Sequence, residues 1–320
     1  MSDPLSSSSY TMVSFYKFYD IENPTEFVLS LEKLWKPFFA LGRVYVAREG
    51  INAQMAIPTN VIGNFKMATK SLPIFESLKL NTDHLVSKEE FEATKPFKAL
   101  HIRVRDQIVA DGFADPSSPS RTPQLDWSKS GQEMSPLEWH EQLNDPNVVV
   151  LDCRNSYESD VGLFDGAIPL NTTFFRESWT ALDSILKDTP KDTKLMTYCT
   201  GGIRCVKINA YLEQRLGFRN VHRLQGGIIS YARELDMQTR NQQETEAEEE
   251  EEVAVEVLTA LPATKNERNV AESKFKGVNY VFDDRIGSRI TEHVLTNCEL
   301  CGAKCDSYNN CQNPPCNVIQ

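Results

Sequence analysis

The stretch that most constrains the fold is residues 194–207, KLMTYCTGGIRCVK. Its apolar run KLMTYC predicts a strand that is buried on both faces, as in a parallel sheet. Two glycines follow, and a helical pattern then runs over residues 203–216 and ends at Gly217. Two more apolar runs, NVVVLDC and VHRL, also alternate with helical patterns. Because such alternation requires parallel β-α-β crossovers, residues 133–240 are expected to form an α/β domain with a doubly wound parallel sheet.

Residues 10–115 show a different order of elements, β-α-β-β-α-β. The first helix is expected to begin at Asn23, an N-cap residue that is followed by a proline and, three residues on, by an acid. A second helix is expected over residues 59–72. Strands are expected in MVSFYKFYDI, RVYVAREG, INAQMAI and KALHIRVRDQIVA, the last of which closes the set. This order predicts a ferredoxin-like (acylphosphatase-like) domain whose helices cover one sheet face only.

Three segments lie outside these two domains. Residues 114–132 are rich in proline, serine and aspartate, and we expect a linker there. Residues 241–256 hold eight glutamates and no basic residue, whereas the net charge of the whole chain is −11. With almost nothing apolar to bury, residues 241–264 are expected to form an acidic linker. Residues 270–320 are expected to form a small Cys-rich tail.

Composition is that of an ordinary globular protein, with 40% hydrophobic and 25% charged residues. No window approaches the ~18 apolar residues of a membrane span. The N-terminus lacks the basic region and the continuous apolar core of a secretory signal, and the first arginine is Arg43, which argues against a transit peptide. We therefore expect a cytoplasmic protein without a membrane partner.

The Cys-rich tail predicts a metal site. Five of the eight cysteines lie in the last 23 residues, and in an intracellular chain this favours metal binding over disulfides. Four of them are expected to hold a structural zinc ion: Cys298, Cys301, Cys311 and Cys316. Four thiolates leave no open position for catalysis. Cys305 is spare or exchanges with a neighbour, and reduced cysteines without metal are the alternative.

Cys199 lies at the carboxyl end of a predicted central strand, where open α/β sheets bind ligands. The active-site loop that follows it consists of Thr200, Gly201, Gly202, Ile203 and Arg204. Its small residues let backbone N–H groups point inward at a helix N-terminus, which lowers the pKa of a thiol and makes it a nucleophile. Arg204 either locks the loop or meets an anionic substrate. The alternative is a buried structural thiol beside a tight turn.

Two other cysteines accompany Cys199 in this domain. Cys205, six residues on, is either a secondary, resolving thiol or part of the core. Cys153 is expected to pack in the core.

A row of polar residues in KALHIRVRDQ suggests an RNA contact. Because side chains alternate along a strand, His101, Arg103 and Arg105 are expected on one face of it. In a ferredoxin-like domain this face can be open, so the row can bind phosphates, and Tyr45 can offer a stacking ring. The chain has no aromatic RRM signature. An ordinary solvated sheet face fits the pattern equally well.

The Cys-x4-Arg pattern of Cys199 and Arg204 resembles a rhodanese domain, together with LDCRNSYESDVGLFDGAIPLNT upstream and LQGGI downstream. Cysteine phosphatases place five residues between the two and hold a phosphate in the wider loop. The loop of four suits a sulfane sulfur or another small group. The resemblance also implies that Asp152 and Arg154 form a structural acid–base pair.

Six segments occur in this order along most of the chain: YKFYDI, VAREGIN, LDCRNSYE, CTGGIRC, KGVNYVFDDR and CELCG…NCQNPPCN. The set resembles the family of oxygen-dependent tRNA uridine hydroxylases, which make 5-hydroxyuridine at the wobble position. The resemblance implies a tRNA substrate, molecular oxygen as co-substrate and Cys199 as the catalytic residue, and it favours tRNA as the ligand of the polar row. We see no flavin, haem or nucleotide motif. The acidic segment departs from the family pattern, but it falls between domains.

Three functions follow from these observations. The loop alone indicates a thiosulfate-type sulfurtransferase that forms a persulfide on Cys199, whereas the whole chain resembles an oxidoreductase that hydroxylates tRNA. A non-catalytic rhodanese module fits least, because the cysteine and the glycines are present. For the hydroxylase, one hypothesis is that the Cys199 thiolate adds to C6 of the uracil ring and makes C5 reactive toward oxygen. The base would have to leave its stack, which costs least in a single-stranded loop.

Overall fold

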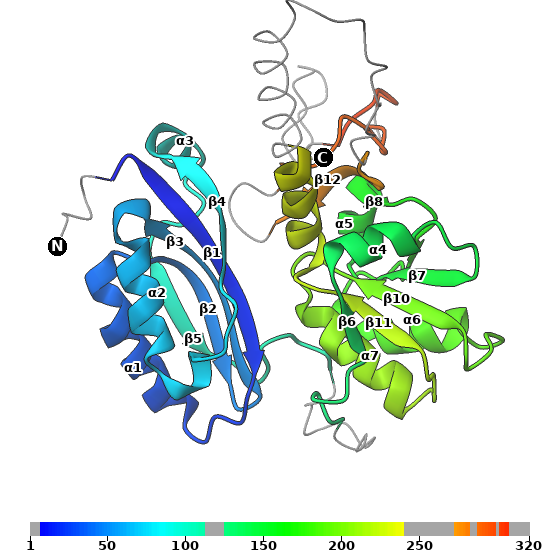
Figure 1. The fold of residues 1–320 in the computed structure, drawn as a ribbon, viewed down its shortest axis with the longest axis horizontal. Coiled ribbons are helices and arrows are strands. Elements are labelled where there is room, and N and C mark those ends of the chain that lie inside the picture. Colours follow the sequence, from blue (N-terminus) through cyan, green and yellow to red (C-terminus); the bar gives the residue numbers. More distant parts are fainter. Residues whose placement is uncertain (1–6, 113–124, 240–271, 282–286, 299–300, 307–320) are drawn as a thin grey trace, which may run out of the picture.

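The computed structural model describes residues 7–112, 125–239, 272–281, 287–298 and 301–306. These residues form two α/β domains that lie side by side, the N-terminal domain in blue and cyan and the central domain in green and yellow (Figure 1). Each domain has its own sheet and its own hydrophobic core. The predicted fold class is confirmed.

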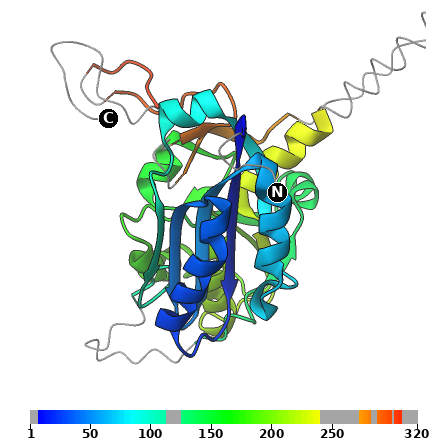
Figure 2. The same cartoon turned by 90° about the vertical axis from the view of Figure 1, so that its left-hand side faces the viewer.

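The N-terminal domain contains eight main elements. They are β1 (Ser9–Phe18), α1 (Pro24–Trp35), β2 (Leu41–Ala47), β3 (Gly50–Pro58), α2 (Ile62–Lys70), β4 (Asn81–Ser87), α3 (Lys88–Thr94) and β5 (Leu100–Val104). The strand order in the sheet is β4-β1-β3-β2-β5. The first four strands with α1 and α2 make the predicted βαββαβ unit, and both helices lie on one face of the sheet, opposite the central domain (Figure 2).

The strand predicted to close this unit does not close it. KALHIRVRDQIVA was the expected fourth strand, but β4 pairs with β1, and β5 lies at the opposite edge, parallel to β2. This prediction is wrong because β4 has the half-polar sequence NTDHLVS, which carries little of the apolar alternation that marks a strand. The extra edge strand widens the second face of the sheet, which α1 and α2 leave open. Helix α3 covers one end of this face, where Phe91 stacks on Tyr10, so the prediction that helices cover one face only is wrong at that end.

Local signals in the N-terminal domain act as predicted. The Asn23 side chain accepts a hydrogen bond from the Glu26 N–H at 3.2 Å and caps α1. The apolar residues of α1 at helical spacing turn inward, and Trp35 is fully buried. The Trp35 indole N–H donates to the Thr69 hydroxyl at 3.0 Å, so the polar atom of this large core residue is satisfied on α2.

The central domain is built on a parallel sheet of order β6-β11-β10-β7-β9. Its elements are β6 (Gln132–Met134), α4 (Pro136–Gln142), β7 (Val148–Asp152), α5 (Ser156–Val161), β9 (Ile168–Pro169), α6 (Ser178–Ile185), β10 (Lys194–Tyr198), α7 (Ile203–Gln214) and β11 (Val221–Leu224). The run KLMTYC forms the central strand β10, buried from Leu195 onward. Helix α7 starts where the glycines end, so the loop that holds Cys199 joins the middle of the sheet to a helix N-terminus.

A second, three-stranded sheet ties the C-terminal region to the central domain. It consists of β8 (Gly162–Phe164), β12 (Phe275–Tyr280) and β13 (Gly287–Arg289), in the order β13-β12-β8. Phe275 is fully buried, and its ring packs on Phe164 at a centroid distance of 5.3 Å. The expected tail from residue 270 therefore opens with a strand that shares the core of the central domain.

Lys207 of α7 joins the two domains. Its side chain is fully buried, and its Nζ donates to Glu49 Oε2 at 2.8 Å and to Asp111 Oδ2 at 2.6 Å. Glu49 lies in the turn between β2 and β3, and its other carboxylate oxygen accepts the backbone N–H of Ile108 at 2.7 Å. A buried lysine between two carboxylates sets the angle between the domains, because any displacement would leave charge unpaired in the interior. No helix in the described ranges has the length and apolar character of a membrane span.

Candidate active site

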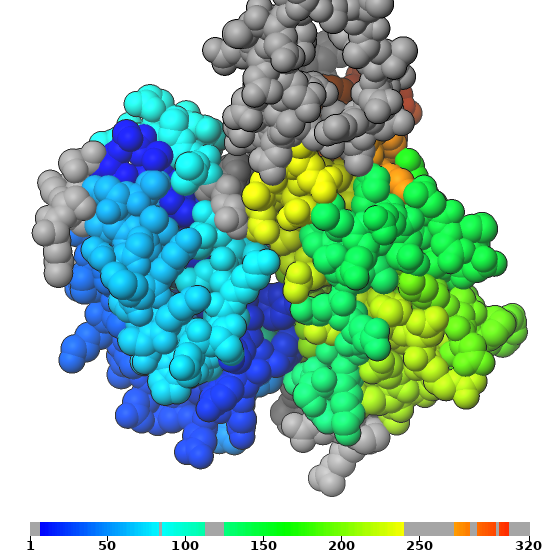
Figure 3. Space-filling model, in the orientation of Figure 1, coloured from blue at the N-terminus to red at the C-terminus, as the bar shows by residue number. Residues whose placement is uncertain are grey.

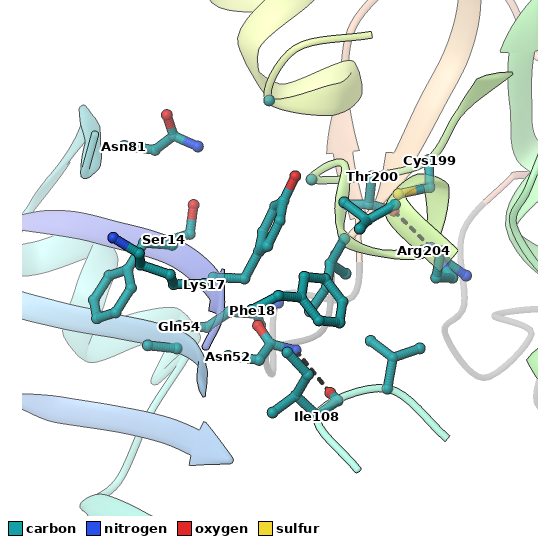
Figure 4. Close-up of a pocket in the computed structure, with 18 of the residues that line it drawn as sticks. Ser14, Lys17, Phe18, Asn52, Gln54, Asn81, Ile108, Cys199, Thr200 and Arg204 are labelled. Atoms are coloured by element: carbon teal, nitrogen blue, oxygen red, sulfur yellow. Dashed lines mark hydrogen bonds between the residues drawn. The ribbon is translucent and has the colours of Figure 1, made fainter. Parts of the chain in front are cut away.

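A cleft of about 960 Å³ separates the open face of the N-terminal sheet from the loop that follows β10. The space-filling view shows it between the cyan and the yellow surfaces (Figure 3). We call its two sides the loop wall, residues 199–204, and the sheet wall, the side chains of β1, β2 and β3 that line the cleft together with Arg105. Residues of the two walls face each other across it, with Ser14, Lys17, Phe18, Asn52 and Gln54 opposite Cys199, Thr200 and Arg204 (Figure 4).

Cys199 lies on the loop wall, where the sequence analysis placed the nucleophile. Its Sγ accepts a hydrogen bond from the Gly202 N–H at 3.1 Å, so the backbone of the loop does turn toward the sulfur. The residue itself is fully buried although it borders the cleft. Gly202, the residue before α7, has φ +94°. Glycine adopts this left-handed conformation without strain.

A second glycine turn holds the loop from behind. The Ile228 N–H donates to the Cys199 carbonyl at 3.1 Å, and the Ile229 N–H donates to the Thr200 carbonyl at 3.2 Å. A Cβ at Gly227 would lie 2.4 Å from the Cys199 carbonyl oxygen. The LQGGI segment therefore supplies the close backbone approach that fixes the loop against the sheet.

Arg204 locks the loop. Its guanidinium makes two hydrogen bonds to the carboxylate of Glu158, at 2.5 and 2.8 Å, and a third to the Thr200 hydroxyl at 3.2 Å. Glu158 is fully buried and Arg204 is nearly so. Of the two roles that the sequence left open for Arg204, the geometry favours the structural one, because the guanidinium is already held by a carboxylate.

Glu158 is a residue of the site that the sequence analysis did not single out. A signal for it exists, because Glu158 occupies the third position of the helix that Asn155 caps in the segment NSYE, and its Oε2 accepts the Asn155 N–H at 3.1 Å. This capping role of Glu158 explains the start of α5. The second role of Glu158, as the partner of Arg204, depends on a residue 46 positions away.

Asp152 and Arg154 form the expected buried pair behind the loop. The Arg154 Nε donates to Asp152 Oδ1 at 2.9 Å, and both side chains are fully buried. The Tyr198 and Ser159 hydroxyls donate to the other carboxylate oxygen at 2.8 and 3.0 Å. All these partners lie within the central domain, so the pair organises the ends of β7 and β10 and does not border the cleft.

The thiol of Cys199 does not have the lowered pKa that the loop predicts. Burial raises its pKa well above the usual value, and the neighbouring thiol of Cys205 raises it further. The positive charge of Arg204 and its backbone N–H lower the pKa, but their effect is smaller than that of burial. The free energy lost when the thiolate is removed from water exceeds the stabilisation that the helix N-terminus and the paired Arg204 guanidinium provide. Cys199 is therefore a neutral thiol in the resting protein.

Cys205 and Cys153 are buried beside Cys199 in one hydrophobic cluster. Burial also raises the pKa of Cys205 well above its usual value. Both the packing role and the resolving role of Cys205 are consistent with this position.

The polar row predicted on this strand borders the cleft at Arg105, which directly follows β5. Arg105 lines the cleft, and its guanidinium lies 5.3 Å from the centre of the Tyr45 ring. His101 and Arg103 are exposed and sit opposite Arg43 and Tyr45 in the β2–β5 pairing, so they share a face with them but do not border the cleft. The sheet wall also contains cleft-lining residues that the pattern did not identify: Tyr16, Lys17, Arg43, Asn52 and Gln54.

The first half of the predicted zinc set forms a tight turn. The Cys301 N–H donates to Cys298 Sγ at 3.4 Å, and the Gly302 N–H donates to the Cys298 carbonyl at 2.8 Å. Cys311 and Cys316 lie outside the described residues. Within the described ranges no group of three or more histidine, cysteine, aspartate or glutamate residues is arranged to hold a metal ion.

Three family models match successive parts of the chain. They are described as "UPF0176 acylphosphatase like domain" over residues 10–108, "Rhodanese-like domain" over residues 135–234 and "Rhodanase C-terminal" over residues 276–320. The tRNA uridine(34) hydroxylase of Photorhabdus laumondii is 36% identical over 97% of this chain and 75% of its own length. Those of Salmonella newport and Leptospira interrogans are both 35% identical, over 98% and 97% of this chain and 77% and 72% of their own lengths.

The chain belongs to the tRNA uridine(34) hydroxylase family. This membership confirms the resemblance drawn from the six ordered segments. It also places a rhodanese loop in a family of oxidoreductases. Among solved structures, a rhodanese-related protein of Thermoplasma volcanium is 24% identical, with a TM-score of 0.27, over 32% of this chain and 92% of its own.

Proposed function

We propose that this protein hydroxylates C5 of the wobble uridine of tRNA with molecular oxygen, and that Cys199 takes part in the chemistry. The observation that carries the proposal is the cleft, which brings a cysteine of a rhodanese loop opposite an open, cationic sheet face of another domain. A sulfurtransferase acting on a small thiol needs no such second wall. The size of the cleft, about 960 Å³, suits a nucleotide that has left its stack.

The proposed role of Cys199 is addition to C6 of the uracil ring. Sulfur forms a bond to C6, the π pair of C5=C6 moves toward C4, and the C4 carbonyl oxygen takes the negative charge. C5 then becomes nucleophilic enough to react with oxygen. Gly202 N–H and the Arg204 charge stabilise the thiolate as it forms, although burial keeps the resting sulfur protonated.

The sheet wall is proposed to hold the RNA. Arg43 and Arg105 line the cleft on the same face as Tyr45, so phosphates and an unstacked base can be bound there together. His101 and Arg103 extend this cationic face beyond the cleft and are proposed to contact more distant phosphates. The active-site residues Thr200, Gly201, Gly202 and Ile203 are proposed to shape the pocket for the base.

A structural zinc ion is proposed for the Cys-rich tail. The turn at Cys298 and Cys301 supports it, because a backbone N–H that donates to a thiolate is what a Cys-x2-Cys ligand pair needs. Cys311 and Cys316 would complete the set. Metal analysis of tag-free protein is expected to give about one zinc per chain, and Cys298→Ser with Cys301→Ser is expected to lose it. A zinc content near zero in the unaltered protein would refute the site.

The domain boundaries proposed above, at residues 10–115, 133–240, 241–264 and 270–320, would place the catalytic loop and the RNA face in different domains. A tRNA substrate also supports a cytoplasmic location.

Nucleoside mass spectrometry tests the function directly. Unmodified tRNA is incubated in air with the protein and dithiothreitol, because placing one oxygen atom on C5 and reducing the other to water takes two electrons. Wild type is expected to yield uridine heavier by about 16 Da, and Cys199→Ala none. If neither yields it, while thiosulfate and cyanide give thiocyanate only when Cys199 is present, the protein is a sulfurtransferase.

A further inference from the structure

Tyr16 is the cleft residue whose position the steps above do not explain. It lies near the end of β1, where Val13 and Phe15 turn into the core and Ser14 and Tyr16 turn to the cleft. Its hydroxyl reaches across the cleft to the loop wall, because a Cβ added at Gly202 would lie 3.0 Å from Tyr16 Oη. The phenol of the N-terminal domain and the glycine whose N–H binds Cys199 therefore meet in one corner of the cleft.

Packing of the Tyr16 ring, and not a hydrogen bond of its hydroxyl, fixes the position of this side chain. The ring packs edge to face with Phe18 at a centroid distance of 6.3 Å. Within the described part of the chain, Tyr16 Oη makes no hydrogen bond. The buried Tyr198 hydroxyl behind the loop, by contrast, donates to Asp152 at 2.8 Å. A phenol in a largely buried corner without a partner is positioned to bind a ligand.

The surroundings of Tyr16 keep it protonated. Burial raises the pKa of the phenol well above its usual value, and the nearby Cys199 adds to the increase, whereas Arg223 lowers it. At neutral pH the group is therefore a hydrogen-bond donor and not a base. A donor beside a nucleophile is useful where negative charge develops on the substrate.

We propose that Tyr16 donates its hydrogen bond to O4 of the target uracil while Cys199 adds to C6, which makes it a catalytic residue supplied by the N-terminal domain. This inference rests on the proposed function. Addition at C6 sends the C5=C6 electron pair through C4 onto O4, and O2 is not conjugated with it. O4 is thus the atom that gains charge. The thiol proton leaves to water, no atom is oxidised in this step, and the phenol keeps its proton.

The step can be isolated from oxygen chemistry. Under argon in D2O the adduct can accept deuterium at C5, lose the original C5 hydrogen and release Cys199, so that uridine gains about 1 Da without any reductant. Wild type is expected to catalyse this exchange in tRNA, and Cys199→Ala is not. Tyr16→Phe is expected to slow it by about 100-fold or more, the effect of removing one donor to a developing oxyanion. Its Kd for tRNA is expected to stay within about twofold of wild type, because the donor acts mainly in the transition state.

Two further proteins control for structure. Tyr19→Phe changes an exposed tyrosine three residues on that does not line the cleft, and it should exchange like wild type. Replacement of Tyr16 by 3-fluorotyrosine keeps the donor and should retain exchange, which assigns the loss in Tyr16→Phe to the missing hydroxyl.

The outcomes separate the inference from the function. Undiminished exchange in Tyr16→Phe overturns the role of Tyr16 and leaves the hydroxylase intact. Equal slowing in the 3-fluorotyrosine protein overturns it as well. If wild type makes 5-hydroxyuridine in air but shows no exchange under argon, addition at C6 and the inference fall while the function stands. If wild type does neither, both fall.

Discussion

The two walls of the cleft hold their polar groups in opposite ways. On the loop wall, Arg204 is buried and is bound by two hydrogen bonds to the buried Glu158 of α5. On the sheet wall, Arg105 is exposed over the Tyr45 ring, and Tyr16 makes no hydrogen bond within the described residues. The charged group of the loop wall thus already has its hydrogen-bond partner within the protein. On the sheet wall, the Arg105 guanidinium and the Tyr16 hydroxyl are positioned to bind a ligand. The difference assigns chemistry to the first wall and recognition mainly to the second.

The largest effect is expected from the sulfur of the loop wall. Cys199→Ala should lower hydroxylation by at least about 10⁴-fold, because loss of a nucleophile removes the step itself. Its Kd for tRNA should remain near that of wild type, since the sheet wall is untouched. Filter binding and nucleoside mass spectrometry on the same preparation measure both. If tRNA affinity fell together with hydroxylation, the loop wall would contribute to binding as well as to chemistry.

The clamp of the loop wall is expected to matter next, for stability. Glu158→Gln leaves the Arg204 charge buried without a carboxylate, which should lower the free energy of unfolding by about 3–5 kcal/mol. Urea unfolding followed by fluorescence measures it. Asp192→Asn is the matched control, because it breaks an ion pair with Arg219 whose side chains are 76% and 71% exposed. It should change the free energy by less than about 1 kcal/mol.

A similar loss in the Asp192 and Glu158 variants would mean that the clamp is no stronger than a surface pair.

The sheet wall is expected to control affinity. Arg43→Glu with Arg105→Glu should weaken tRNA binding by about tenfold or more and reduce the slope of log Kd against log salt by about 0.7 for each phosphate that the protein no longer binds. Lys33→Glu with Lys36→Glu changes the charge by the same amount on exposed residues of the helical side, which faces away from the cleft. If both pairs weaken binding equally, the effect is net charge and not the sheet wall.

The last prediction concerns how the reactivity of Cys199 changes with pH. Because burial raises the pKa of Cys199, the thiol is the resting form and its thiolate fraction should rise tenfold per pH unit below that pKa. Alkylation of Cys199 by iodoacetamide, followed by peptide mass spectrometry, should accelerate from pH 7 to about pH 9 without a plateau. The urea-unfolded chain should reach its plateau at lower pH. A plateau near neutral pH in the folded protein would restore the lowered pKa that the loop pattern predicts.

The sequence by itself determined those features that local interactions encode. The N-cap at Asn23, the buried strand β10 and the glycine loop after it all formed where the pattern indicated. Each depends on residues a few positions apart, so spacing and residue type suffice to predict it. The same local reading gave Cys199 its place at the carboxyl end of a central strand.

Only the tertiary structure decided the rest. The exchange of β4 and β5 at the sheet edges, the partnership of Glu158 with Arg204 and the approach of Tyr16 to Gly202 join residues far apart in the chain. The direction of the Cys199 pKa belongs here too. Local pattern showed the N–H groups that favour a thiolate, but burial is a property of everything packed around the sulfur, and in this protein burial is the larger effect.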